Sequence, residues 1–395
     1  MTTTSFDKLR LVLPDGVANG RVVVDDGLIT AVELLDAPIN ECSPTETDAT
    51  GAAATRLLDG DYLLPGLVEL HTDNVERHLL PRPSARWPNP FAAVLAHDAE
   101  VAAAGITTVY DSMRIGEHEG EPISRRELFP LVADAVNAAR KAGVLRVDHR
   151  LHARCELPDP KLLAALDPLL DDPAVTLLSL MDHTPGQRQW RDVDALRRHH
   201  GSENEAAREQ AIAERIATGQ RHVDENRQRI VARVRERVEA GTLMLASHDD
   251  TTADHVAEAV RDAIGIAEFP CTEVAARAAI ESGLFTLGGA PNVVRGGSHS
   301  GNVAMRQLVR TGLLTGLSSD YVPASTLQAV FLLASQGELS IADAVTLASR
   351  APAERMGIDD RGRIAVGLRA DLVHVSVVSG TPVVRATHVA GQRVA

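Results

Sequence analysis

From residue 63 to residue 320, short apolar runs alternate with longer stretches whose apolar positions recur every three or four residues. A short apolar run between turn residues predicts a buried strand, and the longer period predicts an amphipathic helix. The predicted strands are residues 68–70, 107–110, 148–152, 175–181, 242–247, 266–269, 284–287 and 314–317. The predicted helices are residues 92–104, 126–142, 205–240, 253–263, 271–282 and 302–311. Roughly eight strand–helix units in about 250 residues predict an α/β fold, a (β/α)₈ barrel, with a doubly wound open sheet as the alternative.

The two ends of the chain have a different pattern. Residues 22–24 and 28–32 are apolar runs around Asp26-Gly27, which predicts two strands joined by a tight turn. Near the other end, further short strands are predicted at residues 362–364, 367–375 and 382–389. We therefore predict a small composite β-domain made of both termini, with the barrel inserted between them. The predicted boundaries are residues 1–62 and 361–395 for the β-domain and 63–360 for the barrel.

Residues 205–239 form a long, highly charged stretch in which Arg and Glu often lie three or four positions apart. This spacing predicts one extended helix, or a helical pair, with ion pairs on its surface. A charge run is more often a solvated face than a binding site, so no catalytic residue is assigned to it.

Composition and charge exclude several classes of partner. The length of 395 residues exceeds the size at which single cores usually stop growing, which agrees with a large domain and a small one. A net charge of −14 and only 3% aromatic residues disfavour nucleic acid and anionic membranes. The three cysteines are far apart, which disfavours disulfides and thiolate metal sites. The first residues lack the apolar segment of a signal peptide, and no apolar run reaches the roughly 20 residues needed to span a bilayer, so a cytoplasmic location is expected.

Imidazoles and carboxylates recur directly after the predicted strands. The first strand enters through Pro65-Gly66 and ends in His71-Thr72-Asp73. Residues two apart on a strand point to the same side, so His71 and Asp73 are expected to face one point. Such a pair suits Zn²⁺, Mn²⁺ or Fe²⁺, although a hydrogen-bonded polar pair is the simpler alternative for these two residues alone.

Later strands end in the same residue types. These residues are His152, Glu156, His183, His248 and Asp320. Chemistry in a (β/α)₈ barrel gathers at the carboxyl ends of its strands. A set of imidazoles and carboxylates that converges there predicts a site for one or two divalent metal ions.

The chain resembles one branch of the amidohydrolase superfamily in a series of motifs. These are His71-Thr72-Asp73-Asn74, Met181-Asp182-His183-Thr184-Pro185-Gly186-Gln187, Ser247-His248-Asp249-Asp250, the segment 289–302 and Leu317-Ser318-Ser319-Asp320-Tyr321. The superfamily usually has a second His where this chain has Asp73. That departure limits which branch of the superfamily the chain resembles. Members of the branch hydrolyse the 5-triphosphate of a ribose 1-methylphosphonate to the 5-phosphate, releasing diphosphate, in the carbon–phosphorus lyase pathway.

The resemblance implies a metal-dependent phosphohydrolase that acts on a small phosphorylated ribose phosphonate. His71, Asp73, His183 and His248 are the expected metal ligands. Glu156 is the candidate to bridge two ions, and His152 is the alternative metal ligand. Either residue could instead orient a metal ligand without binding the ion. Asp320 stands where the superfamily has an Asp that binds metal and takes a proton from water, although an Asp there could also cap the next helix.

A triphosphate must also be held. The segment Arg295-Gly296-Gly297-Ser298-His299 offers a guanidinium, an imidazole and backbone amides that glycine leaves accessible. Arg295 and His299 are therefore predicted to bind substrate, and Arg188, close to Gly186, and His152 are further candidates. The alternative for the glycine-rich segment is a structural role only.

Two other functions are kept open. The first is a deaminase or cyclic-amide hydrolase on the same barrel, which release of ammonia would reveal. The second is a catalytically inactive scaffold subunit, which would lack bound metal. The sequence does not decide the metal, the number of ions or whether the chain forms a homo-oligomer.

Overall fold

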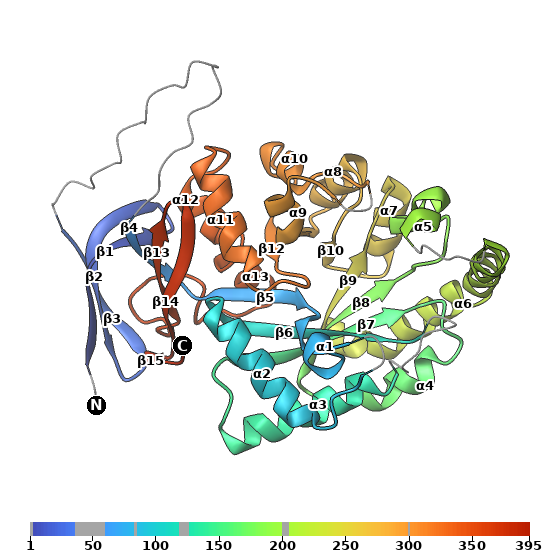
Figure 1. Cartoon of the computed structure of the whole chain (residues 1–395), viewed down its shortest axis with the longest axis horizontal. Helices are drawn as coiled ribbons and strands as arrows, with labels where there is room; N and C mark the ends of the chain where they lie inside the picture. Colours follow the sequence, from blue (N-terminus) through green and yellow to red (C-terminus); the bar gives the residue numbers. More distant parts are fainter. Residues whose placement is uncertain (1–2, 36–59, 83–84, 118–125, 200–204, 299–300) are drawn as a thin grey trace, which may run out of the picture.

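The strands of the described residues form two sheets (Figure 1). The computed structural model describes residues 3–35, 60–82, 85–117, 126–199, 205–298 and 301–395. The larger sheet has eight strands that are neighbours in chain order: β5 (Leu67–Thr72), β6 (Ile106–Ile115), β7 (Asp148–Glu156), β8 (Val175–Met181), β9 (Met244–His248), β10 (Ile266–Glu268), β11 (Phe285–Gly289) and β12 (Gly316–Ser318). The strands are parallel, and a bridge between Thr72 and Asp320 joins the last to the first. The predicted barrel is thus confirmed.

Helices alternate with these strands around the barrel (Figure 1). Their bounds are α1 (Asn74–Leu79), α2 (Pro90–Ala103), α3 (Leu128–Ala142), α4 (Leu162–Leu166), α5 (Val193–His199), α6 (Glu205–Glu239), α7 (Ala253–Arg261), α8 (Glu273–Glu281), α9 (Ala290–Arg295), α10 (Met305–Arg310), α11 (Ser325–Ser335), α12 (Ile341–Thr346) and α13 (Arg350–Arg355), with 3₁₀ turns at Asp167–Leu169 and Arg188–Trp190. All six predicted helices are present. α11 is buried on nearly all sides, so no amphipathic period marks it in the sequence.

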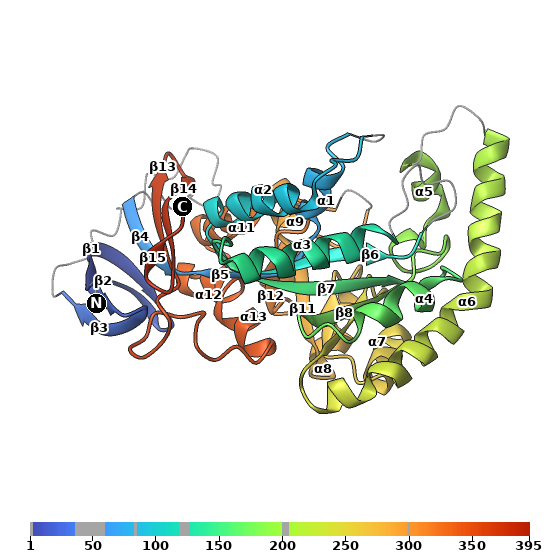
Figure 2. The same ribbon diagram turned by 90° about the horizontal axis from the view of Figure 1, so that it is seen from below.

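The charged stretch forms a single helix, α6, of 35 residues. Figure 2 shows α6 at the end of the molecule far from the sheet that the termini form. Its first half packs against the segment after β8, because Ile212 lies in a small apolar cluster with Trp190 and Leu196. The barrel is therefore extended on that side by a helical arm that reaches toward the end of β8.

Threonine caps fix where two of the barrel helices begin. The Thr252 hydroxyl accepts a hydrogen bond from the backbone N–H of His255 at 3.2 Å, at the start of α7. The Thr272 hydroxyl accepts one from Ala275 at 3.1 Å, at the start of α8. A cap of this kind stabilises a helix by about 1 kcal/mol. Both helices start just after the carboxyl ends of β9 and β10, so the caps keep the connecting segments short at the end where polar residues gather.

The interior of the barrel is apolar at its amino-terminal end. Val68, Leu70, Tyr110, Leu177 and Leu287 are fully buried there, and residues of α13 and the turn after it close this end. Side chains toward the carboxyl ends of the same strands are polar. The barrel therefore has a packed floor and a polar upper end, as expected where the active site lies at the carboxyl ends of the strands.

Both termini build the second sheet. Its order is β15 (Gln392–Arg393), β14 (Thr381–Val389), β13 (Leu372–Val378), β4 (Gly60–Pro65), β1 (Thr4–Leu13), β2 (Gly16–Asp25) and β3 (Leu28–Leu34). The central strand β4 pairs in parallel with β1 and antiparallel with β13. Asp26 and Gly27 have φ values of 49° and 80° in the turn between β2 and β3, as such a hairpin requires. The predicted composite β-domain is confirmed.

Two details differ from the expectations. Residues 362–364 form no strand, because Gly362, at φ 86°, bends the chain tightly against Arg350. The next strand starts only at Leu372. The predicted boundary between residues 62 and 63 falls within β4, and the division into domains stays a prediction.

Within the described residues, no helix combines the length and the apolar character that crossing a bilayer requires.

Candidate active site

A cavity of about 170 Å³ opens at the carboxyl ends of the barrel strands. Residues at or next to the ends of seven of the eight strands, and residues of α9, line it, among them His71, Arg154, His183, His248, Asp249, Arg295 and Asp320. The cavity contains both groups that bind metals and groups that bind anions. Its position and lining make it the candidate active site.

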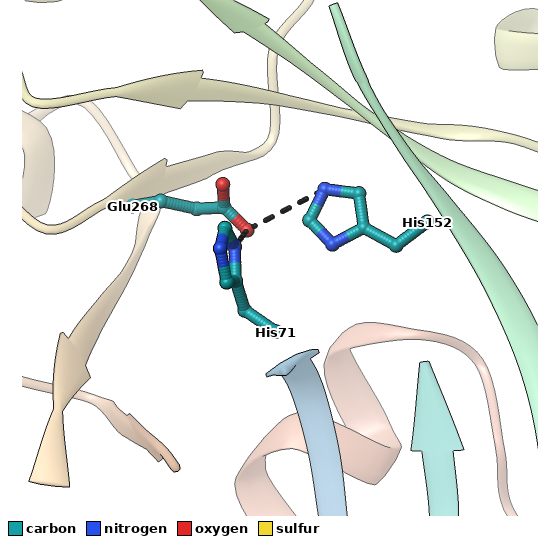
Figure 3. Close-up of side chains that lie close together, drawn as sticks. All are labelled: His71, His152 and Glu268. Carbon is teal, nitrogen blue, oxygen red and sulfur yellow. Dashed lines mark hydrogen bonds and ion pairs between the residues drawn. The ribbon is translucent and has the colours of Figure 1, made fainter. Parts of the chain in front are cut away.

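His71 has the features of a metal ligand. Its Nδ1 lies 3.1 Å from Oε1 of Glu268, at the end of β10 (Figure 3). A neutral imidazole facing a carboxylate carries its proton on Nδ1, which leaves a lone pair on Nε2. That Nε2 is buried and has no hydrogen-bond partner among the described residues. Burial, together with the nearby cation Arg154, holds the pKa of His71 well below its usual value, so the ring stays neutral.

The His152 ring packs edge-on against the His71 ring, with ring centroids 5.0 Å apart. Its Nδ1 donates to the backbone oxygen of Leu70 at 2.9 Å, and its Nε2 contacts the Ser179 hydroxyl. The same hydroxyl donates to Glu268 at 2.7 Å, and Figure 3 shows the Glu268 carboxylate between the two histidines. Both nitrogens of His152 are thus occupied, and the residue is absent from the cavity lining. This placement favours the orienting role that the sequence left open for His152.

His183 and His248 continue the group of imidazoles. The His248 ring lies 5.6 Å from both the His71 and the His183 rings. His248 Nδ1 lies 2.8 Å from Oδ2 of Asp249, and His183 Nε2 lies 3.6 Å from the same oxygen. Asp249 has a left-handed backbone with φ 58°, a conformation that is costly for most side chains and recurs at functional sites.

Glu156 is fully buried at the end of β7. Its Oε2 lies 2.7 Å from Nδ1 of His183, and its Oε1 accepts from the His183 backbone at 3.3 Å. Burial by itself would lower the pKa of His183, but the contacts with Glu156 and Asp249 raise this pKa to about 9. The placement puts Glu156 behind His183, where it can orient the ring.

Asp320 follows β12 and points into the cavity. Its backbone is fixed, since its N–H donates to the His71 oxygen at 3.1 Å and its own oxygen accepts from the Thr72 hydroxyl at 2.7 Å. Burial and the adjacent Asp73 raise the pKa of Asp320 to about 8, and Arg154 opposes this rise. Asp73 itself lies 3.4 Å from the Arg154 guanidinium.

The donor set fits a divalent cation. Three imidazoles and two carboxylates, Asp249 and Asp320, line one cavity, and one of the imidazoles is that of His71, whose Nε2 has no partner among the described residues. A cation there would give that nitrogen a partner and would compensate the repulsion between Asp73 and Asp320. Zn²⁺, Mn²⁺ and Fe²⁺ all accept mixed imidazole and carboxylate ligands.

A second cluster, His97, Asp111 and His149, lies outside the cavity and differs in kind. Asp111 bonds both rings at 2.8 Å, and the remaining nitrogens contact Asn74 and Asp98. Burial by itself would lower the pKa of His149, but Asp111 and Asp98 raise this pKa to about 9. Since every ring nitrogen is already paired, this cluster has a structural explanation without a metal.

The predicted substrate-binding residues are separated by the fold. Arg295 ends α9 and lines the cavity, followed by Gly296 at φ 79°. Arg188 is buried against Asp250 and Glu258 and donates to the His248 oxygen at 3.2 Å, away from the cavity lining. His299 lies outside the described residues.

Arg154 and Glu268 at the site were not predicted from sequence, and Asp249 was named only as part of a motif. Arg154 alternates with His152 and Glu156 along β7, so the period of a strand places it on their side. Asp249 directly follows His248. Glu268 is the only charged residue of β10, and a carboxylate at the end of a buried strand is the signal that could have found it.

Glu268→Gln is expected to weaken metal binding about 10-fold, because an amide holds the His71 ring less firmly than a carboxylate does. Titration of the metal-free protein with Zn²⁺ against a chelating indicator measures this. Glu273→Gln, a partly exposed carboxylate at the start of α8, is the matched control and should leave the metal affinity unchanged. Unchanged affinity in Glu268→Gln would remove Glu268 from the site.

Comparisons with known proteins agree with this geometry. The model of the amidohydrolase family matches residues 88–395. The chain is 41% identical over 374 residues to α-D-ribose 1-methylphosphonate 5-triphosphate diphosphatase of Escherichia coli (strain K12), a match that covers 93% of this chain and 94% of that protein.

Solved structures share the fold at low identity. The 5-methylcytosine deaminase of Klebsiella pneumoniae superposes with a TM-score of 0.61 at 13% identity, covering 99% of this chain and 98% of that one. Dihydropyrimidinase from Brevibacillus agri gives 0.58 at 13%, covering 99% and 95%. The match to the family model, supported by the extent of the Escherichia coli match, shows that this chain belongs to the amidohydrolase family.

Proposed function

We propose that this chain is the hydrolase that converts the 5-triphosphate of α-D-ribose 1-methylphosphonate to the 5-phosphate in phosphonate catabolism. The reaction adds one water across the anhydride between the α and β phosphoryl groups and releases diphosphate. The observation that carries the proposal is the 41% identity to the diphosphatase over nearly the whole of both chains. The cavity supports it, because metal-type ligands and two arginines meet there.

Amidohydrolases generally bind divalent metal ions, and His71, His183 and His248, with Asp73 and Asp320, would hold one or two of them here. A bound divalent ion would lower the pKa of a water ligand and neutralise charge on the phosphates. Zinc, manganese or iron suits these donors. Glu268 and Glu156 would orient His71 and His183 through their Nδ1 atoms.

Asp320 is the proposed general base. Its carboxylate faces the cavity, and its backbone bonds to His71 and Thr72 keep it in place during the reaction. A positive charge in the cavity would favour its ionised form, which can take the proton of the attacking water.

Arg295 and Arg154 are the proposed phosphate-binding cations. They come from different parts of the barrel, since Arg295 ends the helix after β11 and Arg154 lies on β7. Guanidinium groups match phosphate oxygens in pairs. Ser298, beside Gly297 in the lining, adds a hydroxyl. His299 and Arg188 stay predictions. For Arg188, the buried ion pairs with Asp250 and Glu258 disfavour binding of substrate.

Arg295→Ala is expected to raise KM for a ribose 5-triphosphate about 10- to 100-fold with a smaller change in kcat, since a charge-assisted hydrogen bond contributes about 1.5–3 kcal/mol. Steady-state kinetics with saturating metal measures both constants. Arg310→Ala, an exposed arginine on α10, is the control. A fall in kcat alone would place Arg295 at the reacting phosphoryl group instead.

Phosphorus NMR of the reaction mixture tests the function itself. We expect diphosphate and the 5-phosphate as the only products from the ribosyl triphosphate. Ammonia release from a cyclic amide or an aminopyrimidine, without diphosphate release, would favour the deaminase or cyclic-amide hydrolase. Absence of bound metal and of all turnover would favour the scaffold subunit. The homo-oligomer and the cytoplasmic location stay predictions from the sequence.

A further inference from the structure

A second cavity lies at the amino-terminal end of the barrel. Its volume is about 1100 Å³, comparable with pockets that hold organic ligands. Residues that precede or begin β8, β9 and β10 line it, such as Pro173, Leu243 and Gly265, together with the end of α13. The catalytic residues lie at the other ends of these strands, so this cavity belongs to a different face.

Arg355, in the lining of this cavity, is a cation with no carboxylate partner among the described residues. Its Nη2 donates to the backbone oxygen of Gly265, and a side chain at Gly265 would collide with the same nitrogen. Its Nε is buried and has no hydrogen-bond partner in the described part of the chain. No described carboxylate forms an ion pair with it, and burial lowers the pKa of Arg355 with nothing to oppose it. A half-buried guanidinium in this state has unused capacity to bind an anion.

Two more arginines line the cavity. Arg237 donates to the backbone oxygens of Leu170 and Val175, both at 2.6 Å, and has no ion pair with a described carboxylate. Arg150 lies 3.5 Å from Asp148, but that carboxylate also binds Arg361 at 2.9 Å. Neither arginine is therefore fully neutralised by its neighbours.

The carboxylates of the lining do not balance these charges. Asp171 pairs with Arg233 at 3.3 Å, and Glu354 pairs with Arg350 at 2.7 Å. Neither of those two partner arginines lines the cavity. In a chain of net charge −14, the cavity is thus a local excess of positive charge. Apolar side chains share the same walls, including Leu243, Met244 and Ile264.

We propose that this cavity binds a small organic phosphate ester, with its phosphate on Arg355 and Arg150 and its organic part on the apolar wall. A phosphate dianion matches two guanidinium forks in charge and in geometry. Inorganic phosphate alone would leave the apolar residues without a contact. The carbon atoms of an ester would be buried against them, which favours an organic phosphate as the ligand. The proposal is independent of the catalytic activity at the opposite end of the barrel.

Calorimetric titration of the metal-loaded protein with ribose 5-phosphate tests this site. The titrated protein carries Arg295→Ala, a background in which binding to the catalytic cavity is weakened. We expect this variant to keep one binding site for ribose 5-phosphate. The double variant Arg295→Ala with Arg355→Gln should bind ribose 5-phosphate at that site at least 10-fold more weakly. Arg350→Gln, on the same helix but outside the lining, is the matched control and should leave the affinity unchanged.

A second variant covers the case in which Arg355→Gln does not fold. Arg150→Gln, also in the lining and partly exposed, should weaken the same site at least 10-fold. Two outcomes overturn the proposal. One is loss of all binding in Arg295→Ala alone, and the other is equal affinity in the background with and without each cavity variant.

Discussion

Asp320→Asn is expected to slow diphosphate release by about 10²–10⁴-fold. For a base next to a metal, we expect the upper part of this range. The amide keeps the size of the side chain but cannot accept a proton at neutral pH. The fold should be preserved, because Asp320 is held through its backbone and asparagine tolerates the observed φ of 52°. Single-turnover kinetics with a ribose 5-triphosphate, alongside metal analysis and thermal unfolding, measures each of these outcomes.

Asp134→Asn, on the exposed face of α3, controls for the general effect of removing a carboxylate. Near-normal turnover of Asp320→Asn with metal bound would show that the base is elsewhere. The next candidates would be Asp249, which lines the cavity, and Glu156, which is buried behind His183. Loss of metal together with activity would instead make Asp320 mainly a ligand.

His248→Asn should remove most of the bound metal and all measurable turnover. His248 lies between His71 and His183, with ring centroids 5.6 Å from each, so its loss opens the middle of the ligand group. The effect on metal affinity should exceed the roughly 10–100-fold that follows loss of a residue that only orients a ligand. Elemental analysis of the purified variant, after equilibration with a defined Zn²⁺ concentration, gives the metal content.

His222→Asn, on α6 and remote from the cavity lining, is the matched control for this substitution. A metal content in His248→Asn equal to that of the unchanged protein would exclude His248 as a ligand. In that case the site would have to be built around the other cluster that includes His71, with His152 and Glu268.

The sequence alone determined where the strands and most of the helices lie, because periodicity is a local property. The predicted run at residues 175–181 coincides with β8, and the charged stretch became α6 as one helix. The ends of the strands could be read as well, so His71, His183, His248 and Asp320 were found as a group. They followed from one rule, that a parallel barrel brings all its carboxyl strand ends to one face.

Only the tertiary structure decided which of the polar groups face the cavity and which stand behind it. Glu268 meets His71 across 197 residues of chain, a contact that arises from barrel closure and leaves no local pattern. Glu156 and His152 share the inward side of β7 with Arg154, yet of the three only Arg154 reaches the cavity lining. Arg188 follows a turn suited to an anion, and the fold pairs it with Asp250 instead. Periodicity gives the side of a strand, whereas the depth and the partner of a buried charge depend on segments far away in sequence.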